Sequence, residues 1–497
     1  MPLPLQRRET VFRILFLLVF AAAAFAYVAH RQRGIGACDW FGYFELGQLF
    51  ARGQVSLDTL LPAQHYPALV PLGFLAEGGP ALPYYSPGYP LLLAAASFGH
   101  AEFFVTPLLG LLSGWLLFLL VRELTDRWTA LAATAAWLFF PIVVYASTKV
   151  MNDIAATVPL LASYLLYRRK HLPASALLLG FSLCIRPTNA LYCLAFALPL
   201  LRDRQVVRFV LWMLPTAGAY ALYNQLLYGA PWKTGYNNLA ADLTTVAFGG
   251  HLTFFLVETV KHLGPLALCA GFVRQVRPRS ELVFYVLWFA AYLLFFSFWR
   301  SGGTYWPVAG EARPDSTWWW MRFLLPAYPP LFLLTALGLH RIREYLAEPL
   351  RSAAVRQTGQ AALVALVLCT PLYQIRLGAK HRDLWLHEAG LEYVRTVRAV
   401  EAIAPPGSCI GSVEFAGSFR VYSDRVPFVS TSDNAPALVT ELFRRGRPVY
   451  LVVEPWNSGN PVVQLLLARH RGEPIREIPV WGAIAVTVYR LAPAAAP

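Results

Sequence analysis

The chain has 497 residues, of which 57% are hydrophobic and only 14% are charged. A soluble core cannot hide that much apolar surface, so the composition indicates a mainly α-helical, polytopic membrane protein. The formal charge of +14 is compatible with a nucleic-acid partner, but Lys and Arg fall in short clusters between apolar runs. Such clusters are typical of cytoplasmic loops, so we expect no nucleic acid as a partner.

Apolar runs follow one another along the first three quarters of the chain. The first run, Val11 to Ala29, is long for a signal peptide and lacks an A-x-A cleavage site, so we expect it to be retained. A window of about 20 residues predicts eleven spans, near 10–29, 102–121, 128–147, 153–167, 172–187, 188–201, 206–228, 252–273, 282–299, 322–339 and 359–376.

The segment from Pro87 to His100 is apolar but short, and it begins with Pro-Gly-Tyr-Pro. We interpret it as an interfacial or re-entrant helix, because counting it as a span would invert every later loop. With the N-terminus inside, the basic clusters between spans then all fall on the cytoplasmic side. This register predicts a multi-pass protein of the inner (plasma) membrane with a large first extracytoplasmic loop at 30–100.

The chain divides into a membrane domain, 1–376, and a tail, 377–497. The tail has a helical pattern near Leu391 to Ile403, a Pro-Pro-Gly turn, and strand-like runs at Cys409–Phe415, Val449–Val453 and Ile484–Tyr489. These features predict a small extracytoplasmic α/β domain.

Asp39 stands just outside the first span, at the start of a segment that predicts an amphipathic helix along the membrane surface. A partly desolvated carboxylate becomes a stronger base, so Asp39 is a candidate general base for an acceptor hydroxyl. An N-cap of the helix that follows explains the residue equally well.

A second acidic candidate, Asp153, follows Lys149 at the outer junction between two predicted spans. The two residues are four apart, so on one helix they could simply pair with each other. In the functional interpretation Lys149 holds a substrate phosphate, while Asp153 orients the acceptor or the lysine.

Several cations fall on the same predicted side of the membrane. Arg186 ends a span at Pro187, and a guanidinium suits phosphate because it stays charged and donates two hydrogen bonds side by side. The alternative for Arg186 is snorkelling to the headgroup layer. Further cations on this side are Lys233, Arg300, Arg313 and Arg322. Together they predict a pocket for a lipid phosphate.

Aromatic residues gather on this side too, at Tyr84, Tyr85, Trp232, Tyr236 and the run Trp318 to Trp320. Their rings can stack on a sugar, although Trp and Tyr also form the usual interfacial belt, which we favour for the tryptophan run. No His, Cys or carboxylate cluster has metal-ligand spacing, so we expect no metal site. The absence of a Walker or dinucleotide motif argues against a nucleotide-sugar donor or an ATP-driven pump.

Taken in order, these motifs resemble a known family. The chain resembles bacterial GT-C-class glycosyltransferases of the protein O-mannosyltransferase and aminoarabinose-transferase-like group, over most of residues 10–376. The residues that carry the resemblance are Asp39 with Tyr43 and Ala51-Arg52-Gly53, the run Tyr84 to Leu91, Lys149 to Asp153, Arg186-Pro187-Thr188, and Gly229 through Tyr236.

The resemblance implies a membrane enzyme that moves a sugar from a polyprenyl-phosphate carrier to an acceptor hydroxyl on the outer face. Asp39 matches the catalytic base of an inverting displacement, and Asp153 matches a further acidic position. Lys149 and Arg186 match basic positions near the donor phosphate. Trp40 departs from the pattern, because many relatives carry a second acidic residue there.

The resemblance implies no cofactor besides the lipid-linked donor, although a role for a divalent metal stays open. The acceptor could be a lipid, a glycan or a protein. A transporter or lipid flippase is the main alternative, but such proteins tend to show inverted repeats and charged, broken helices at mid-membrane. A non-catalytic scaffold that binds a cell-wall partner is a third.

Overall fold

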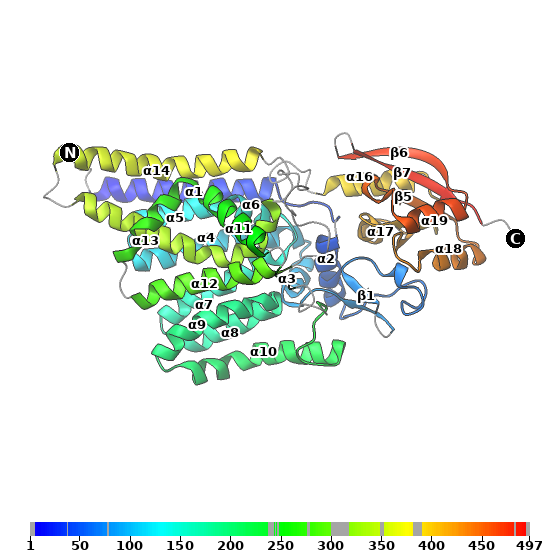
Figure 1. The fold of residues 1–497 in the computed structure, drawn as a ribbon, viewed down its shortest axis with the longest axis horizontal. Coiled ribbons are helices and arrows are strands. Elements are labelled where there is room, and N and C mark those ends of the chain that lie inside the picture. The colour runs from blue at the N-terminus through cyan, green and yellow to red at the C-terminus, as the bar shows by residue number, and fades with distance from the viewer. Residues whose placement is uncertain are drawn as a thin grey trace.

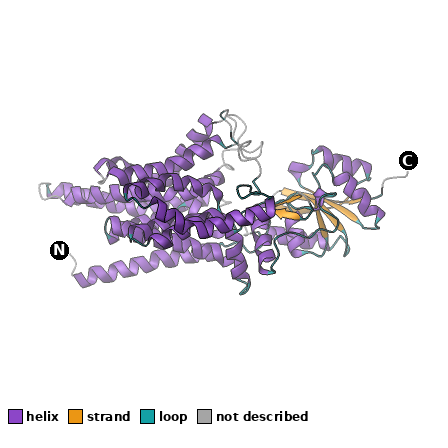
Figure 2. Cartoon of the chain, turned by 90° about the horizontal axis from the view of Figure 1, so that it is seen from below, coloured by secondary structure: helices purple, strands orange, loops and turns teal. Residues whose placement is uncertain are grey.

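The structure is a computed structural model that describes residues 5–36, 38–76, 79–236, 243, 245, 248–275, 279–299, 318–347, 352–380, 390–481 and 484–493. It has two parts, a helical bundle and a C-terminal domain at one end of that bundle (Figure 1). The strands of that domain lie beyond the helix ends, and the N-terminus lies at the far end of the bundle (Figure 2). Between the two parts lie α2 and α3 of the first loop, while β1 lies below the C-terminal domain in this view (Figure 1).

The bundle is built from long apolar helices. Seven of the helices that the structure describes are long and apolar enough to span a membrane, and the pair α5 and α6, bent by 61°, would make an eighth. The bundle helices are α1 (Leu5–Ala29), α4 (Val105–Leu124), α5 (Arg127–Leu138), α6 (Pro141–Thr148), α7 (Asn152–Arg168), α8 (Leu172–Ile185), α9 (Ala190–Arg202), α10 (Val206–Tyr228), α11 (Phe248–Leu263), α12 (Arg279–Phe298), α13 (Tyr328–Ala347) and α14 (Ala353–Lys380), with 3-10 turns η2 (Glu102–Phe104), η3 (Pro187–Asn189), η4 (Gly264–Gln275) and η5 (Trp318–Ala327).

All eleven predicted spans fall on these helices, and the protein is a multi-pass membrane protein. Three of the spans, α7, α8 and α9, have only 17, 14 and 13 residues. Proline ends or begins helices in this region, because it lacks an N–H and disfavours helical geometry in the residue before it. Pro141 begins α6, and Pro187 follows the end of α8.

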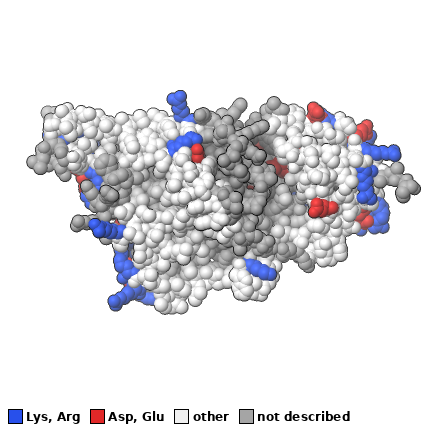
Figure 3. All heavy atoms as spheres, viewed as in Figure 1, with Lys and Arg blue, Asp and Glu red and all other residues white. Residues whose placement is uncertain are grey.

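Charge is distributed unevenly over the bundle. Figure 3 shows Lys and Arg gathered at the end that lies away from the C-terminal domain, with few charged atoms over the side of the bundle. The exposed large hydrophobic residues include Leu17, Phe25, Leu211 and Leu226, which lie on α1 and α10. An apolar side surface and a basic end are what a bilayer and the positive-inside rule require.

The first loop contains α2 (Cys38–Ala51), η1 (Pro67–Leu69), a hairpin of β1 (Phe74–Ala76) and β2 (Ala81–Pro83), and α3 (Gly88–Ser97). With 10 residues, α3 is about 15 Å long, which is too short to cross a bilayer and agrees with the prediction for this segment. The prediction of a surface helix at α2 was wrong in one respect. Other elements, among them α3 and α17, pack against α2. Its buried residues therefore lie on more than one face of the helix and include Phe41, Tyr43, Glu45 and Leu46.

The C-terminal domain has a five-stranded sheet in the order β4-β3-β5-β7-β6. Strands β4 (Val426–Val429), β3 (Cys409–Ser412) and β5 (Val449–Val453) pair in parallel, whereas β7 (Ile484–Leu491) pairs antiparallel with β5 on one side and with β6 (Glu473–Trp481) on the other. Its helices are α16 (Leu391–Glu401), α17 (Ala416–Tyr422), α18 (Ala435–Arg444) and α19 (Pro461–Arg469). The predicted α/β class is confirmed, with β4 and β6 added, and α14 runs past the predicted boundary to Lys380.

The C-terminal domain packs closely against the first loop. The backbones of Gly34 and Gly390 lie so near each other that a Cβ atom on either would meet the other's carbonyl oxygen at 2.4 Å or less. The Ser418 hydroxyl donates to the Ile35 carbonyl at 2.9 Å, and the Ile35 N–H donates to the Tyr422 hydroxyl at 2.7 Å. These contacts hold the start of α2, which contains Asp39, in place.

We expect Gly417→Ala to destabilise the protein, although alanine is the better helix former. The new Cβ would lie 2.4 Å from the ring of Phe41 on α2, and such overpacking typically costs about 1–3 kcal/mol. Thermal unfolding of the purified protein measures the effect. Gly459→Ala is the control, because nothing lies within 4 Å of its added Cβ; equal stability of the two variants would contradict the close contact.

Candidate functional site

A cavity of about 880 Å³ opens between the first loop and the ends of several bundle helices. Each of α7, α9 and α12 has one end at this cavity, as does the 3-10 turn η5. Its lining residues are Asp39, Tyr43, Tyr84, Tyr85, Met151, Asn152, Asp153, Arg186, Pro187, Thr188, Ala190, Leu191, Tyr228, Trp232, Lys233, Thr234, Tyr236, Phe295, Trp299, Arg322 and Phe323.

Asp39 lies in the first turn of α2 and is held from two sides. Its Oδ1 accepts a hydrogen bond of 2.5 Å from the Tyr85 hydroxyl, and its Oδ2 accepts one of 2.8 Å from the Arg322 guanidinium. The Arg322 side chain is 8% exposed, whereas that of Asp39 is 29% exposed. The carboxylate is therefore fixed by a buried cation but still reaches the cavity, and its contacts go beyond those of an N-cap.

Asp153 and Arg186 form a second, more deeply buried ion pair. Arg186 Nη1 lies 2.8 Å from Asp153 Oδ1, and the two side chains are 8% and 4% exposed. The guanidinium also lies over the rings of Phe296 and Phe323, 5.6 Å from each centroid. Arg186 therefore does not snorkel to the headgroup layer. A buried pair of this kind is retained only when both charges are matched, since removing one partner leaves the other uncompensated.

The predicted alternative pair of Lys149 and Asp153 does not form on one helix. Between them the chain leaves the helical conformation, because α6 ends at Thr148 and α7 begins at Asn152. Lys149 is buried, with its ammonium group 5.6 Å from the centroid of the Trp40 ring. It is not among the lining residues of the cavity, so its role in phosphate binding stays a prediction.

Four tyrosines form an aromatic wall. The rings of Tyr43 and Tyr85 lie 4.3 Å apart, and those of Tyr84 and Tyr236 lie 4.7 Å apart. Burial raises the pKa of Tyr43 and of Tyr236, so both keep neutral hydroxyls. Gly235 makes the wall possible, because a Cβ there would lie 2.2 Å from the Tyr84 carbonyl oxygen. Flat rings beside neutral hydroxyls suit the apolar and polar faces of a sugar.

The charge of the cavity is biased toward anions. Its cationic side chains are Arg186, Lys233 and Arg322, and its acidic ones are Asp39 and Asp153. Both acids are paired with arginines, whereas exposed Lys233 has no acidic partner among the residues that the structure describes. An entering anion would find a cation whose charge is not yet matched.

Most predicted site residues therefore converge, including Asp39, Tyr43, Tyr84, Tyr85, Asp153, Arg186, Lys233, Tyr236 and Arg322. Arg300 and Arg313 lie outside the described residues. Sequence reasoning missed Met151, whose sulfur lies 3.1 Å from Arg322 Nη1, and the lining residues Tyr228 and Trp299. Met, Tyr and Trp at or beside the ends of apolar helices carry no signal that distinguishes a cavity wall from a core.

Sequence reasoning also missed Glu414, which the C-terminal domain places near Asp39. Burial raises the pKa of the Glu414 carboxyl, and the charges of Glu454 and Asp39 raise it further, while the hydrogen bond from Tyr393 lowers it. The Tyr393 hydroxyl donates to Glu414 Oε1 at 2.9 Å, and the Tyr393 ring meets that of Trp40 at 6.0 Å. A second carboxyl group thus lies close to the first loop, although position 40 is a tryptophan.

A metal ion could bind at this site only if enough suitable ligand side chains converge there. Among the residues that the structure describes, no three His, Cys, Asp or Glu side chains converge in a way that could hold a metal ion. The two acids at the cavity are each paired with an arginine. The described donor set therefore does not fit a metal site of its own.

Comparison with known proteins gives the fold. A family model described as dolichyl-phosphate-mannose-protein mannosyltransferase matches residues 92–225, a segment that holds Asp153 and Arg186. No curated protein matches the sequence. The ArnT structure from Cupriavidus metallidurans bound to undecaprenyl phosphate is 15% identical with a TM-score of 0.63, and the match covers 98% of each chain. The chain has the GT-C fold.

Two other GT-C structures match over smaller shares of their own length. The Archaeoglobus fulgidus oligosaccharyltransferase has a TM-score of 0.55 at 11% identity, over 89% of this chain and 69% of that one. The arabinofuranosyltransferase AftD from Mycobacteria has a TM-score of 0.53 at 14% identity, over 97% of this chain and 40% of that one. The ArnT match therefore includes the C-terminal domain, because it covers nearly the whole of both chains.

Glu414 gives a prediction about pH. A carboxyl group whose pKa is raised by folding stabilises the folded state fully below its unfolded value, about 4.5, and that contribution is lost as the pH rises through the folded pKa. We expect Glu414→Gln, which is neutral at every pH and can still accept from Tyr393, to gain stability over the native protein as the pH is raised. Thermal unfolding between pH 4 and 8 measures this difference.

The matched control is Glu477→Gln, because Glu477 is an exposed residue of β6. Its difference from the native protein should stay constant over the same pH range. A Glu414→Gln difference that is also constant with pH would mean that burial does not perturb this carboxyl group.

Proposed function

We propose that the protein is a glycosyltransferase that moves a sugar from a polyprenyl-phosphate carrier to an acceptor hydroxyl, with Asp39 as the general base. The observation that carries the proposal is the pairing of Asp39 with Arg322 at the wall of a cavity that Arg186 and Lys233 also line. A base and several phosphate-binding cations in one cavity are what this reaction needs. The GT-C fold and the undecaprenyl phosphate in the ArnT structure support it.

The donor phosphate belongs near the cations. The leaving polyprenyl phosphate gains negative charge as the glycosidic bond breaks, and fixed cations stabilise that charge without reorganising. Arg322 and Arg186 are held rigidly by their acidic partners, while Lys233 lies on an exposed loop beside Trp232. We assign Lys233 to the first contact with the phosphate, and the two arginines to holding the bound phosphate and stabilising it in the transition state.

The reaction is a single inverting displacement. The acceptor oxygen attacks the anomeric carbon, and the bond between that carbon and the phosphate oxygen breaks, leaving polyprenyl phosphate. The acceptor proton passes to Asp39, whose two oxygens are oriented by Tyr85 and Arg322. The tyrosine wall, formed by Tyr43, Tyr84, Tyr85 and Tyr236, lies beside this point and provides the surface for the sugar.

The ion pair of Asp39 with Arg322 also explains how Asp39 becomes able to accept a proton. Arg322 neutralises the carboxylate in the empty cavity, and an incoming phosphate competes for the same guanidinium. When Arg322 shares its guanidinium N–H groups between the phosphate and Asp39, the ion pair of Asp39 is weakened and the carboxylate becomes a stronger base. Binding of the donor phosphate thus increases the basicity of Asp39.

The cavity is lined by Asp39 and Tyr43 of α2, and α2 lies at the end of the bundle next to the C-terminal domain, opposite the basic end (Figures 1 and 3). Under the positive-inside rule the basic end is cytoplasmic. We therefore place the reaction on the extracytoplasmic face of the inner membrane, with the C-terminal domain outside. Acceptors in this location are lipids, glycans and proteins of the cell envelope.

We expect Asp39→Asn to abolish transfer while donor binding stays at least as tight as in the native protein. The amide cannot accept the acceptor proton, and it releases Arg322 from its counter-ion to the phosphate. Turnover of a polyprenyl-phosphate sugar and equilibrium binding of polyprenyl phosphate are the two measurements. Asp58→Asn, at an exposed carboxylate of the same loop, should leave both unchanged; full turnover by Asp39→Asn would refute the assignment of the base.

We expect Arg186→Ala to weaken donor binding by about tenfold or more, since a charge-assisted hydrogen bond contributes roughly 1.5–3 kcal/mol. Binding of polyprenyl phosphate is best measured in the Asp39→Asn background, where no turnover occurs. Arg122→Ala, at an exposed arginine near the basic end of α4, serves as the control. Unchanged affinity in a folded Arg186→Ala protein would place the phosphate elsewhere.

A further inference from the structure

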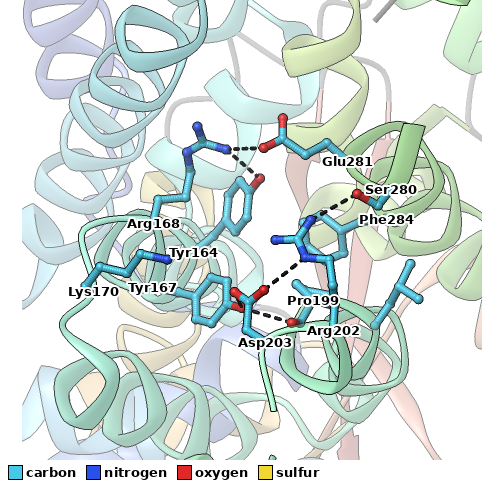
Figure 4. Close-up of a pocket in the computed structure, with 11 residues that line it drawn as sticks. Tyr164, Tyr167, Arg168, Lys170, Pro199, Arg202, Asp203, Ser280, Glu281 and Phe284 are labelled. Atoms are coloured by element: carbon cyan, nitrogen blue, oxygen red, sulfur yellow. Dashed lines mark hydrogen bonds and ion pairs between the residues drawn. The ribbon is translucent and has the colours of Figure 1, made fainter. Parts of the chain in front are cut away.

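A second cavity, of about 310 Å³, lies at the opposite end of the same three helices, α7, α9 and α12. One end of α7 carries Asp153 in the first cavity, and the other end carries Arg168 in the second, about 23 Å away along the helix. Figure 4 shows the residues that line the second cavity. This cavity has no part in the proposed reaction.

Both carboxylates of this second cavity already have partners. Arg202 Nε donates to Asp203 Oδ1 at 2.9 Å, and the Tyr167 hydroxyl donates to Asp203 Oδ2 at 2.5 Å. Arg168 Nη1 donates to Glu281 Oε1 at 2.8 Å. Hydrogen bonds from Arg202 and Tyr167 lower the pKa of Asp203, so it stays ionised. The acidic groups are therefore engaged and would not attract a cation.

By contrast, some hydrogen-bond donors of this cavity are not engaged by its acidic groups. Lys170 lines the cavity, and its charge helps to lower the pKa of Asp203, but among the residues that the structure describes its ammonium group makes no ion pair within 4.0 Å. Arg202 donates through Nε to Asp203 and through Nη1 to the Ser280 hydroxyl, which leaves further N–H groups of its guanidinium for a ligand. In the view of Figure 4, Lys170 and Arg202 extend toward each other. Spare donors between engaged acceptors select an anion.

The apolar residues of the cavity indicate which kind of anion would bind there. Leu198, Pro199 and Phe284 line it beside the charged groups, and the helix ends that form it stand at the boundary between the apolar side surface and the basic end of the bundle. A small soluble anion would gain nothing from the apolar wall. A lipid with a charged headgroup would use both surfaces.

We propose that this cavity binds the phosphodiester headgroup of an anionic phospholipid of the leaflet opposite the Asp39 cavity. The phosphate lies between Lys170 and Arg202, and the start of the acyl region lies against Leu198 and Phe284. The site does not depend on the proposed enzymatic function.

The backbone at Lys170 provides a variant that should not disturb folding. Lys170 follows the end of α7 with φ 65°, in the left-handed region that favours glycine. Arg204 occupies the same kind of position after α9, with φ 54°. Each is a cation in a turn that glycine would adopt more easily, but Arg204 does not line the cavity. Lys170→Gly and Arg204→Gly therefore remove the same charge in the same backbone setting.

The experiment is native mass spectrometry of the full-length protein titrated with phosphatidylglycerol, phosphatidylcholine or inorganic phosphate. We expect phosphatidylglycerol to bind in preference to phosphatidylcholine. Lys170→Gly should weaken this binding about fivefold, the usual contribution of one basic residue at an anionic lipid surface. Arg204→Gly should leave it unchanged, and Lys170→Arg should retain it. Thermal unfolding should show both glycine variants to be at least as stable as the native protein.

Three results would overturn the proposal. Equal loss in both glycine variants would mean that phosphatidylglycerol responds to the overall charge of this end and not to the cavity. Competition by inorganic phosphate at the same concentrations as the lipid would assign the cavity to a soluble anion. Equal binding of phosphatidylglycerol and phosphatidylcholine would leave the cavity as a network of ion pairs that only joins the helices.

Discussion

The structure of the site depends on one carboxylate, that of Asp39, held between the Tyr85 hydroxyl and the Arg322 guanidinium. These residues are far apart in the chain, and each belongs to a different segment. A buried guanidinium is tolerated only beside a counter-ion, so Arg322 needs Asp39 as much as Asp39 needs Arg322. The pair ties the first loop to the bundle and leaves one edge of the carboxylate open to the cavity.

The second ion pair leaves Lys233 as the cavity cation whose charge is not matched, among the described residues, before a ligand arrives. Asp153 and Arg186 come from α7 and from the end of α8, and their pairing fixes two shorter helices against each other. Fixed charges of opposite sign in a partly dehydrated site can respond to a charged substrate without large rearrangement. The four side chains of the two ion pairs therefore contribute to both stability and reactivity, and variants at these positions affect both.

Helix positions, the short interfacial helix α3 and strands β3, β5 and β7 could be predicted from the sequence, because apolar length and turn residues determine them. The convergence of Asp39, Arg186, Lys233 and Arg322 followed from the charge of the loops. The pairing of Asp153 could not be predicted, because its spacing from Lys149 suited a continuous helix and the break at residues 149 to 151 has no strong breaker residue. Strand β6 could not be predicted either, because it contains Glu473, Arg476 and Glu477 and lacks the alternation of apolar and polar residues that is typical of a strand. The position of Glu414 near the first loop results from tertiary packing, which the sequence pattern does not indicate.

The contact between Gly34 and Gly390 constrains how the two parts of this protein can vary. Each glycine excludes any side chain on the other, so the first loop and the C-terminal domain fit as a matched set. A chimaera that joins this bundle to the C-terminal domain of another GT-C protein would have to carry both glycine segments, or else the new domain would push the start of α2 out of position. Exchange of the C-terminal domain between such proteins is therefore limited by these two positions, where only a glycine fits.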